Sequence, residues 1–181
     1  MRQRLYSFIY SFILGWKYRL SVPKFDKCVV CAAPHTTNSD LFIGKLFYGA
    51  IGKRASFLMK KEWFFFPIGF LMRLIGGIPV DRSHKTSLTE EMSQIFSRKK
   101  HFNLAITPEA TRSANPNWKR GFYYIALKAK VPIVLVGIDY KTKTITASKY
   151  LWANGDVETQ MNEIKRYFTQ FKGKHPERFA I

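Results

Sequence analysis

The pattern of apolar and polar positions along the chain predicts strands that alternate with helices. In four segments the apolar residues recur with helical spacing, and in the segments between them they run with few polar interruptions. The predicted strands are 27–33, 55–60, 102–107, 131–140 and, at an edge of the sheet, 143–148, and the predicted helices are 41–51, 86–100, 118–130 and 156–171. This order is typical of an α/β fold with a mainly parallel central sheet flanked by helices, in which ligands bind at the carboxyl ends of strands.

The length of the chain favours one domain. Its 181 residues, 46% of them hydrophobic, are enough for a single substantial core. We expect residues 21–181 to form this domain and residues 1–20 to form a separate helix at a membrane interface. The uncharged segment 5–16 lies between basic residues and is shorter than the ~20 residues that a spanning helix needs. A terminal helix packed on the core is the main alternative; a signal peptide would need a small-residue cleavage site, which is missing here.

A second apolar segment, 62–78, is dense in aromatic residues. It is broken by Pro67 and two glycines and contains Arg73, so it does not fit a membrane span. A lipid-facing surface or acyl-chain cavity and ordinary core remain equal interpretations of this segment.

The charge of the chain points to an acidic partner. Lys and Arg total 30 against 12 Asp and Glu, a formal net charge of +18. An anionic membrane surface, an acidic carrier protein and nucleic acid would all satisfy it. The sequence has no zinc-finger spacing, basic zipper or RRM signature, so we expect no nucleic acid partner.

Two cysteines, Cys28 and Cys31, lie in the first predicted strand. Side chains three residues apart on a strand point to opposite faces, which argues against a disulfide or a shared metal. We therefore expect buried free thiols and no metal site.

The segment PHTTNSD follows this strand directly and contains His35 and Asp40. His35 must stand on the turn before the next helix, with Asp40 in or near the first turn of that helix reaching back. A carboxylate can fix the tautomer of an imidazole and stabilise the imidazolium, as a general base requires. The pair alone is weak evidence of catalysis.

Three further segments follow this pair in a fixed order. They are GGIPVDR, which ends at Arg82; PEATR, with Glu109, Thr111 and Arg112; and VPIVLVG, which starts at Val131. With the His35 to Asp40 segment, this series resembles the four ordered motifs of the glycerolipid acyltransferase superfamily, which includes the lysophosphatidic acid acyltransferases. The resemblance covers roughly residues 25–140.

The resemblance implies acyl transfer from acyl-CoA or acyl carrier protein to the hydroxyl of a lysophospholipid, with no cofactor and no covalent acyl-enzyme. His35 would deprotonate the hydroxyl and Asp40 would orient His35. Arg82, Thr111 and Arg112 would bind the phosphate of the acceptor, for which guanidinium groups are suited. Glu109 would position the arginines or the loop.

The chain departs from the family pattern at Ala110, where glycine is usual. If this position needs a positive φ, or a close approach of the substrate to its amide, alanine is strained there, which leaves the identity of the acceptor open. Lys119, in WKRG, matches a Lys-x-Gly that often follows the third motif, and it is a further candidate for phosphate binding.

The expected protein is thus a peripheral or monotopic enzyme on the cytoplasmic face of a membrane, which acylates lysophosphatidic acid. Acylation of another single-chain lipid, such as a lyso-aminolipid without phosphate, is an alternative. A non-catalytic basic module that binds anionic lipid is the alternative outside the enzyme class.

Overall fold

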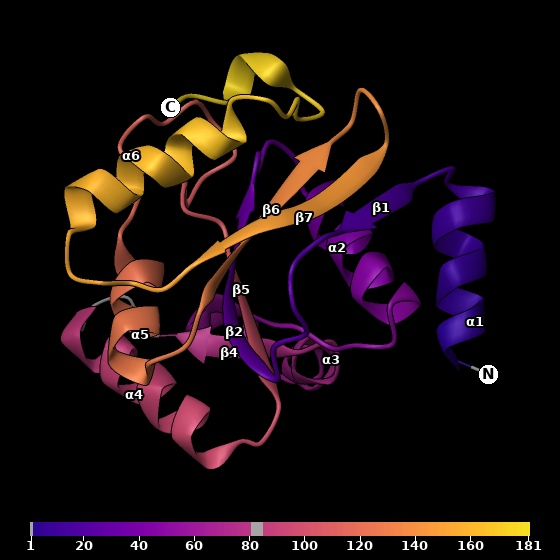
Figure 1. Cartoon of the computed structure of the whole chain (residues 1–181). Helices are drawn as coiled ribbons and strands as arrows, with labels where there is room; N and C mark the ends of the chain where they lie inside the picture. The colour runs from indigo at the N-terminus through magenta and orange to yellow at the C-terminus, as the bar shows by residue number, and fades with distance from the viewer. Residues whose placement is uncertain (1, 81–84) are drawn as a thin grey trace.

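The central feature of the structure, a computed structural model, is one mixed sheet (Figure 1). The model describes residues 2–80 and 85–181. Within them the strand order is β1-β7-β6-β2-β5-β3-β4, and neighbouring strands are parallel except for the antiparallel pair β6 and β7. The predicted fold class is confirmed. The strands are β1 Lys17–Leu20, β2 Lys27–Ala33, β3 Ser56–Lys60, β4 Gly77–Val80, β5 Phe102–Ile106, β6 Ile133–Asp139 and β7 Thr144–Leu151.

Helices cover both faces of this sheet (Figure 1). The N-terminal segment and α2 pack on one face, and α4, α5 and α6 contribute the core of the other. The four predicted helices correspond to α2, α4, α5 and α6. The helices are α1 Arg2–Ser7, the π-helix η1 Phe8–Ile13, α2 Ser39–Ala50, the 3-10 turn η2 Lys61–Trp63, α3 Ile68–Leu74, α4 Lys85–Arg98, α5 Gly121–Ala129, α6 Val157–Phe168 and the 3-10 turn η3 Pro176–Arg178.

Strand β2 lies between β5 and β6 at the centre of the sheet and supplies core residues to both faces. Cys28 packs in the core on the α2 side and Cys31 in the core on the α5 side. Both are free and buried, as predicted from their spacing.

The N-terminal segment differs from the predicted helix over residues 1–20. Helical structure ends at Ile13, Gly15 has a φ of +68°, and Lys17–Leu20 forms β1. This strand pairs with β7, because the outer edge of β7 offers unpaired backbone groups that a further turn of helix could not satisfy. The prediction that 143–148 is an edge strand is wrong for the same reason. None of the helices in the described ranges has both the length and the apolar content that a bilayer span requires.

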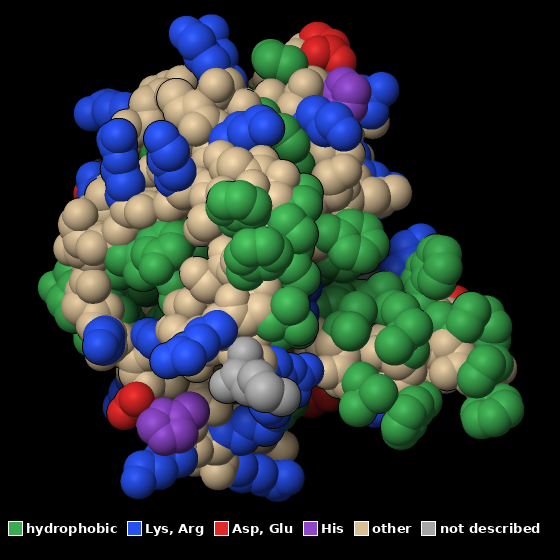
Figure 2. All heavy atoms as spheres, turned by 90° about the vertical axis from the view of Figure 1, so that its right-hand side faces the viewer, with side chains coloured by type: hydrophobic (Ala, Val, Ile, Leu, Met, Phe, Trp, Pro, Cys, Tyr) green, Lys and Arg blue, Asp and Glu red, His purple; other side chains and the backbone are tan. Residues whose placement is uncertain are grey.

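Segment 62–78 is not ordinary core. It forms η2, α3 and the unpredicted strand β4, and large apolar side chains project from it into solvent. Figure 2 shows hydrophobic side chains gathered on one projecting part of the molecule, while most Lys and Arg side chains of this face lie elsewhere. The exposed apolar residues of the segment are Trp63, Phe65, Phe66, Phe70, Leu71 and Leu74.

Candidate active site

The candidate site lies where three parallel strands end side by side. Strand β2 pairs in parallel with β5 on one side and with β6 on the other. The carboxyl ends of these strands therefore meet at one edge of the sheet. PHTTNSD follows β2, TPEATR follows β5, and Tyr140 follows β6 directly.

His35 and Asp40 form a hydrogen-bonded pair, in the arrangement expected from their spacing. Asp40 lies in the first turn of α2, and its Oδ2 is 3.0 Å from His35 Nδ1. The same oxygen accepts the backbone N–H groups of Thr36 at 2.9 Å and of Thr37 at 3.0 Å. Because Oδ2 already accepts two backbone N–H groups, we assign it as the acceptor from the imidazole as well, so Nδ1 of His35 carries the proton. The lone pair of Nε2 is then free to accept a proton from a substrate.

The two side chains of the pair differ in their exposure to solvent. The Asp40 side chain is 3% exposed, whereas the His35 side chain is 19% exposed. The carboxylate is therefore closed off from water, while the imidazole can be reached from outside.

The second oxygen of Asp40 has a partner that sequence analysis missed. The hydroxyl of Tyr140 donates to Asp40 Oδ1 at 2.7 Å across 100 residues of sequence. The signal that could have identified Tyr140 is its place directly after the most apolar strand, at the same sheet edge as both polar motifs.

Glu109 supports the turn that carries His35. Its side chain is buried, and Oε1 accepts the backbone N–H of His35 at 2.8 Å. Oε2 has no hydrogen-bond partner within the part of the chain described. Burial raises the pKa of the Glu109 carboxyl from its ordinary 4.5 to about 7, and the hydrogen bond from His35 offsets part of this effect.

The residues after Glu109 bring a guanidinium to the rim of the site. Ala110 has a φ of +57°, so the position requires the left-handed conformation that the usual glycine adopts freely. For alanine this conformation costs about 1–2 kcal/mol. Thr111 Oγ1 accepts the backbone N–H of Ser113, and Arg112 Nη1 donates to Asn38 Oδ1 at 2.5 Å. Arg112 thus lies against the turn between His35 and Asp40.

Two further predicted phosphate ligands are Arg82 and Lys119. Arg82 lies outside the described residues. Lys119 is exposed, and its backbone N–H donates to Pro108 O at 2.8 Å, which holds the loop that begins with PEATR. His35, Asp40, Glu109 and Arg112 are the predicted residues that the structure brings into contact around one turn.

A C-terminal segment that sequence analysis did not connect with the site packs behind this turn. Thr36 is fully buried, and its Oγ1 accepts the backbone N–H of His175 at 3.3 Å. A Cβ on Gly173 would lie 2.7 Å from Cγ2 of Thr36, so only glycine permits this approach. The backbone of the chain after α6 therefore fixes the His35 turn from behind.

Comparison with known proteins identifies the family of the chain. The family model described as Acyltransferase matches residues 19–139, which is more than half of the chain. This chain belongs to the Acyltransferase family.

Two curated acyltransferases resemble the chain. It is 30% identical over 112 residues to 1-acyl-sn-glycerol-3-phosphate acyltransferase beta of Homo sapiens, covering 59% of this chain and 40% of that protein. It is 28% identical over 145 residues to 1-acyl-sn-glycerol-3-phosphate acyltransferase of Cocos nucifera, covering 76% of this chain and 44% of that protein. The chain spans less than half the length of these relatives.

The fold also resembles a solved acyltransferase. The crystal structure of the 1-acyl-sn-glycerophosphate (LPA) acyltransferase PlsC from Thermotoga maritima matches with a TM-score of 0.60 and 16% sequence identity. The match covers 91% of this chain and 76% of that one. At this identity the similarity shows a shared fold.

The turns after β2 and β5 lie inside the Acyltransferase match, whereas Tyr140 and the C-terminal segment lie beyond its end. The contacts of Tyr140 with Asp40 and of His175 with Thr36 therefore involve residues outside the family match and are seen only in the structure.

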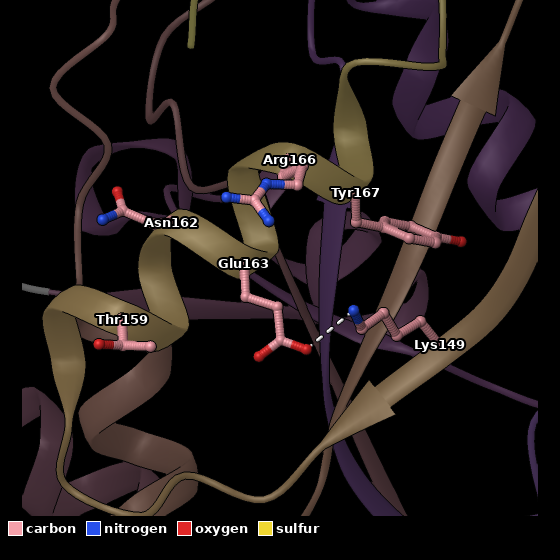
Figure 3. Close-up of a pocket in the computed structure, with 6 residues that line it drawn as sticks. All are labelled: Lys149, Thr159, Asn162, Glu163, Arg166 and Tyr167. Carbon is pink, nitrogen blue, oxygen red and sulfur yellow. Dashed lines mark ion pairs between the residues drawn. The ribbon is translucent and has the colours of Figure 1, made fainter.

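Two pockets of the molecule lie apart from the candidate site residues. One is an open groove of about 600 Å³ between β7 and α6, where Lys149 and Glu163 form an ion pair at 2.8 Å (Figure 3). The other is an apolar pocket of about 230 Å³ between α2 and the sheet, lined by Phe47 and Val134 among others. Neither includes His35, Asp40, Glu109 or Arg112 in its lining.

The buried Glu109 carboxyl makes the stability of the fold depend on pH. Because the pKa of Glu109 is raised on folding, its protonation stabilises the folded state fully below pH 4.5, and this contribution is lost as the pH rises through about 7. Relative to Glu109→Gln, the free energy of unfolding of the wild type should fall by about 2–3 kcal/mol between pH 4.5 and 7.5. Urea unfolding at several pH values measures this difference.

Glu158→Gln is the matched control, since the Glu158 side chain on α6 is 70% exposed. Parallel stability curves for the wild type and Glu109→Gln over this range would contradict a buried carboxyl with a raised pKa.

Proposed function

We propose that the protein is an O-acyltransferase that moves a fatty acyl group from a thioester, acyl-CoA or acyl carrier protein, to the hydroxyl of lysophosphatidic acid. The observation that carries the proposal is the His35 and Asp40 pair, whose imidazole presents a free Nε2 in a member of the Acyltransferase family. The names of the curated relatives, which are 1-acyl-sn-glycerol-3-phosphate acyltransferases, support the choice of acceptor.

The reaction needs a group that first accepts a proton as a base and then returns it as an acid, and we assign both roles to His35. His35 Nε2 takes the proton of the acceptor hydroxyl while its oxygen attacks the thioester carbonyl. The resulting imidazolium is stabilised by the Asp40 carboxylate, 3.0 Å from Nδ1. The tetrahedral intermediate collapses, the carbon–sulfur bond breaks, and the imidazolium returns the proton to the leaving thiolate. No protein nucleophile is required.

Arg112 is the proposed phosphate ligand at this site. Its guanidinium lies at the rim, and one nitrogen donates to Asn38, three residues after the base. Within the described residues no acceptor pairs with the remaining N–H groups, which leaves them for phosphate oxygens, and a guanidinium binds these with paired donors. Lys119 is the second candidate on the same loop.

The membrane surface is the proposed partner. Apolar side chains are exposed on η1 and on the segment around α3, including Phe12 at 78% and Phe66 at 92% exposure. The formal net charge of +18 favours an anionic bilayer under these side chains. A peripheral position on the cytoplasmic face, where the leaflet carries anionic lipid, agrees with this charge.

Replacement of the base tests the reaction directly. His35→Ala should lower kcat by about 10²–10⁴-fold, because general base catalysis contributes this much. Release of free thiol from acyl-CoA in the presence of lysophosphatidic acid measures the rate. The control is His101→Ala, which removes an exposed histidine that also pairs with an aspartate, Asp26, at 3.0 Å.

Wild-type turnover in the His35→Ala variant would eliminate His35 as the base. A wild-type protein that consumes no thioester with any lysolipid would favour a non-catalytic lipid-binding module.

The Arg112→Ala variant tests whether the acceptor carries a phosphate. Loss of a charge-assisted pair should raise KM for lysophosphatidic acid about 10-fold or more and leave monoacylglycerol turnover unchanged. Arg120→Ala is the control, because Arg120 pairs with Glu158 on α6 at 2.6 Å. An equal KM for Arg112→Ala and wild type would instead favour an acceptor without phosphate, such as a lyso-aminolipid.

The exposed aromatic residues around α3 are tested by vesicle binding. The double variant Phe66→Ser and Phe70→Ser should lower binding to vesicles of phosphatidylcholine and phosphatidylglycerol about 10-fold or more, because each ring removes apolar area from water in the bilayer interface. Sedimentation with the vesicles measures the bound fraction. Trp152→Ser is the control, since Trp152 is 54% exposed but follows β7. Unchanged binding of the double variant would rule out this surface.

A further inference from the structure

Tyr140 occupies a position that the acyl-transfer proposal has not yet used. It lies at the carboxyl end of β6, and its hydroxyl donates to Asp40 Oδ1 at 2.7 Å. The three other donors to this carboxylate, from His35, Thr36 and Thr37, all use Oδ2. Within the part of the chain described, Tyr140 is the partner of the other oxygen.

This arrangement fixes the rotation of the carboxylate. With donors only at Oδ2, the plane of the carboxylate could rotate part-way about the Cβ–Cγ bond and lose its alignment with the imidazole of His35. A donor at Oδ1 opposes that rotation and keeps Oδ2 directed at His35 Nδ1. Water cannot readily replace the hydroxyl, because the Asp40 side chain is only 3% exposed.

Tyr140 also remains a donor at neutral pH. Burial, together with the hydrogen bond to Asp40 and the negative charge of its carboxylate, raises the pKa of the Tyr140 hydroxyl well above its ordinary value. The proton therefore stays on the phenol.

Tyr140 is held at its ring and at its backbone. The edge-on ring of the buried Trp16 lies with its centroid 4.9 Å away, and the Tyr140 backbone N–H donates to Lys172 O at 2.8 Å. Trp16 in turn follows η1, whose buried Tyr10 packs against Phe47 of α2. The segment that exposes Phe12 to the proposed membrane surface is thus continuous with the side chain that holds Tyr140.

We propose that Tyr140 is a positioning residue for the His35 and Asp40 pair, and that Trp16 acts on the same pair through the Tyr140 ring. The inference rests on the proposed acyl transfer. Tyr140 touches neither acceptor nor donor; it keeps the Asp40 carboxylate in the one orientation that stabilises the imidazolium when His35 takes the proton.

Tyr140→Phe removes the hydroxyl and keeps the ring. It should lower kcat about 10-fold or more, with KM for lysophosphatidic acid within about twofold of wild type, because the lost hydrogen bond orients the base and does not bind substrate. Tyr18→Phe is the matched control, since the Tyr18 ring packs in the same aromatic group against Tyr10 and Phe47. The thermal unfolding midpoint of each variant is measured in parallel.

A spectroscopic measurement tests the same role without turnover. In the wild type, ¹⁵N spectra of the His35 imidazole, assigned with His35→Gln, should show the tautomer with the proton on Nδ1. In Tyr140→Phe the fraction of the Nε2-protonated tautomer should rise, because a carboxylate that Tyr140 no longer aligns accepts the hydrogen bond from Nδ1 less well. An unchanged tautomer together with wild-type kcat would overturn the role of Tyr140.

Trp16→Phe tests the second part of the proposal. It should lower kcat less than Tyr140→Phe, and the double variant should be no slower than Tyr140→Phe alone, because both changes act through one hydroxyl. Multiplicative effects would show that Trp16 acts independently of Tyr140.

The outcomes separate the two proposals. A wild-type protein without thioester consumption refutes the proposed function, while the His35 tautomer still reports whether Tyr140 orients the pair. A turnover-competent wild type with a fully active, folded Tyr140→Phe refutes the positioning role alone.

Discussion

The structure of the site depends on one buried charge, the carboxylate of Asp40. A carboxylate removed from water is stable only when its oxygens are supplied with donors. Asp40 receives four: the imidazole of His35, two backbone N–H groups of the turn after β2, and the hydroxyl of Tyr140 after β6. The same contacts that keep the charge stable also orient the imidazole of His35.

The parallel sheet makes this concentration of donors possible. Its central strands β5, β2 and β6 end at one edge, and each is followed by a residue that contacts the His35 turn or its carboxylate. Glu109 accepts the N–H of His35 from one side and Tyr140 donates to Asp40 from the other. The turn is thus held by side chains that are 74 and 100 residues distant in sequence from their partners.

The N-terminal segment connects this edge of the sheet with the surface of the molecule. The N-terminal segment buries Tyr10 and Trp16 toward α2 and Tyr140, and it exposes Phe8 and Phe12 on its outer side. An amphipathic segment of this kind can contact a bilayer with one side and the active-site support with the other. The proposed lipid surface and the proposed base are therefore linked through the same few aromatic rings.

The sequence by itself determined the elements whose pattern is local. Strand β2, the helix α2 and the pairing of His35 with Asp40 follow from apolar periodicity and from the screw of a helix, which act over a few residues. The left-handed backbone at Ala110 was also indicated by its place in the family pattern, and the structure has it at a φ of +57°.

Only the tertiary structure decided features that depend on a distant partner. Residues 17–20 form a strand and not a helix because the edge of β7 supplies hydrogen bonds that their own sequence does not encode. The exposure of the aromatic residues around α3 depends on which surfaces the other helices cover, and apolar composition is the same for a core and for a lipid-facing surface. Tyr140 became part of the site because β6 pairs beside β2; a pattern read along one strand contains no information about its neighbour in the sheet.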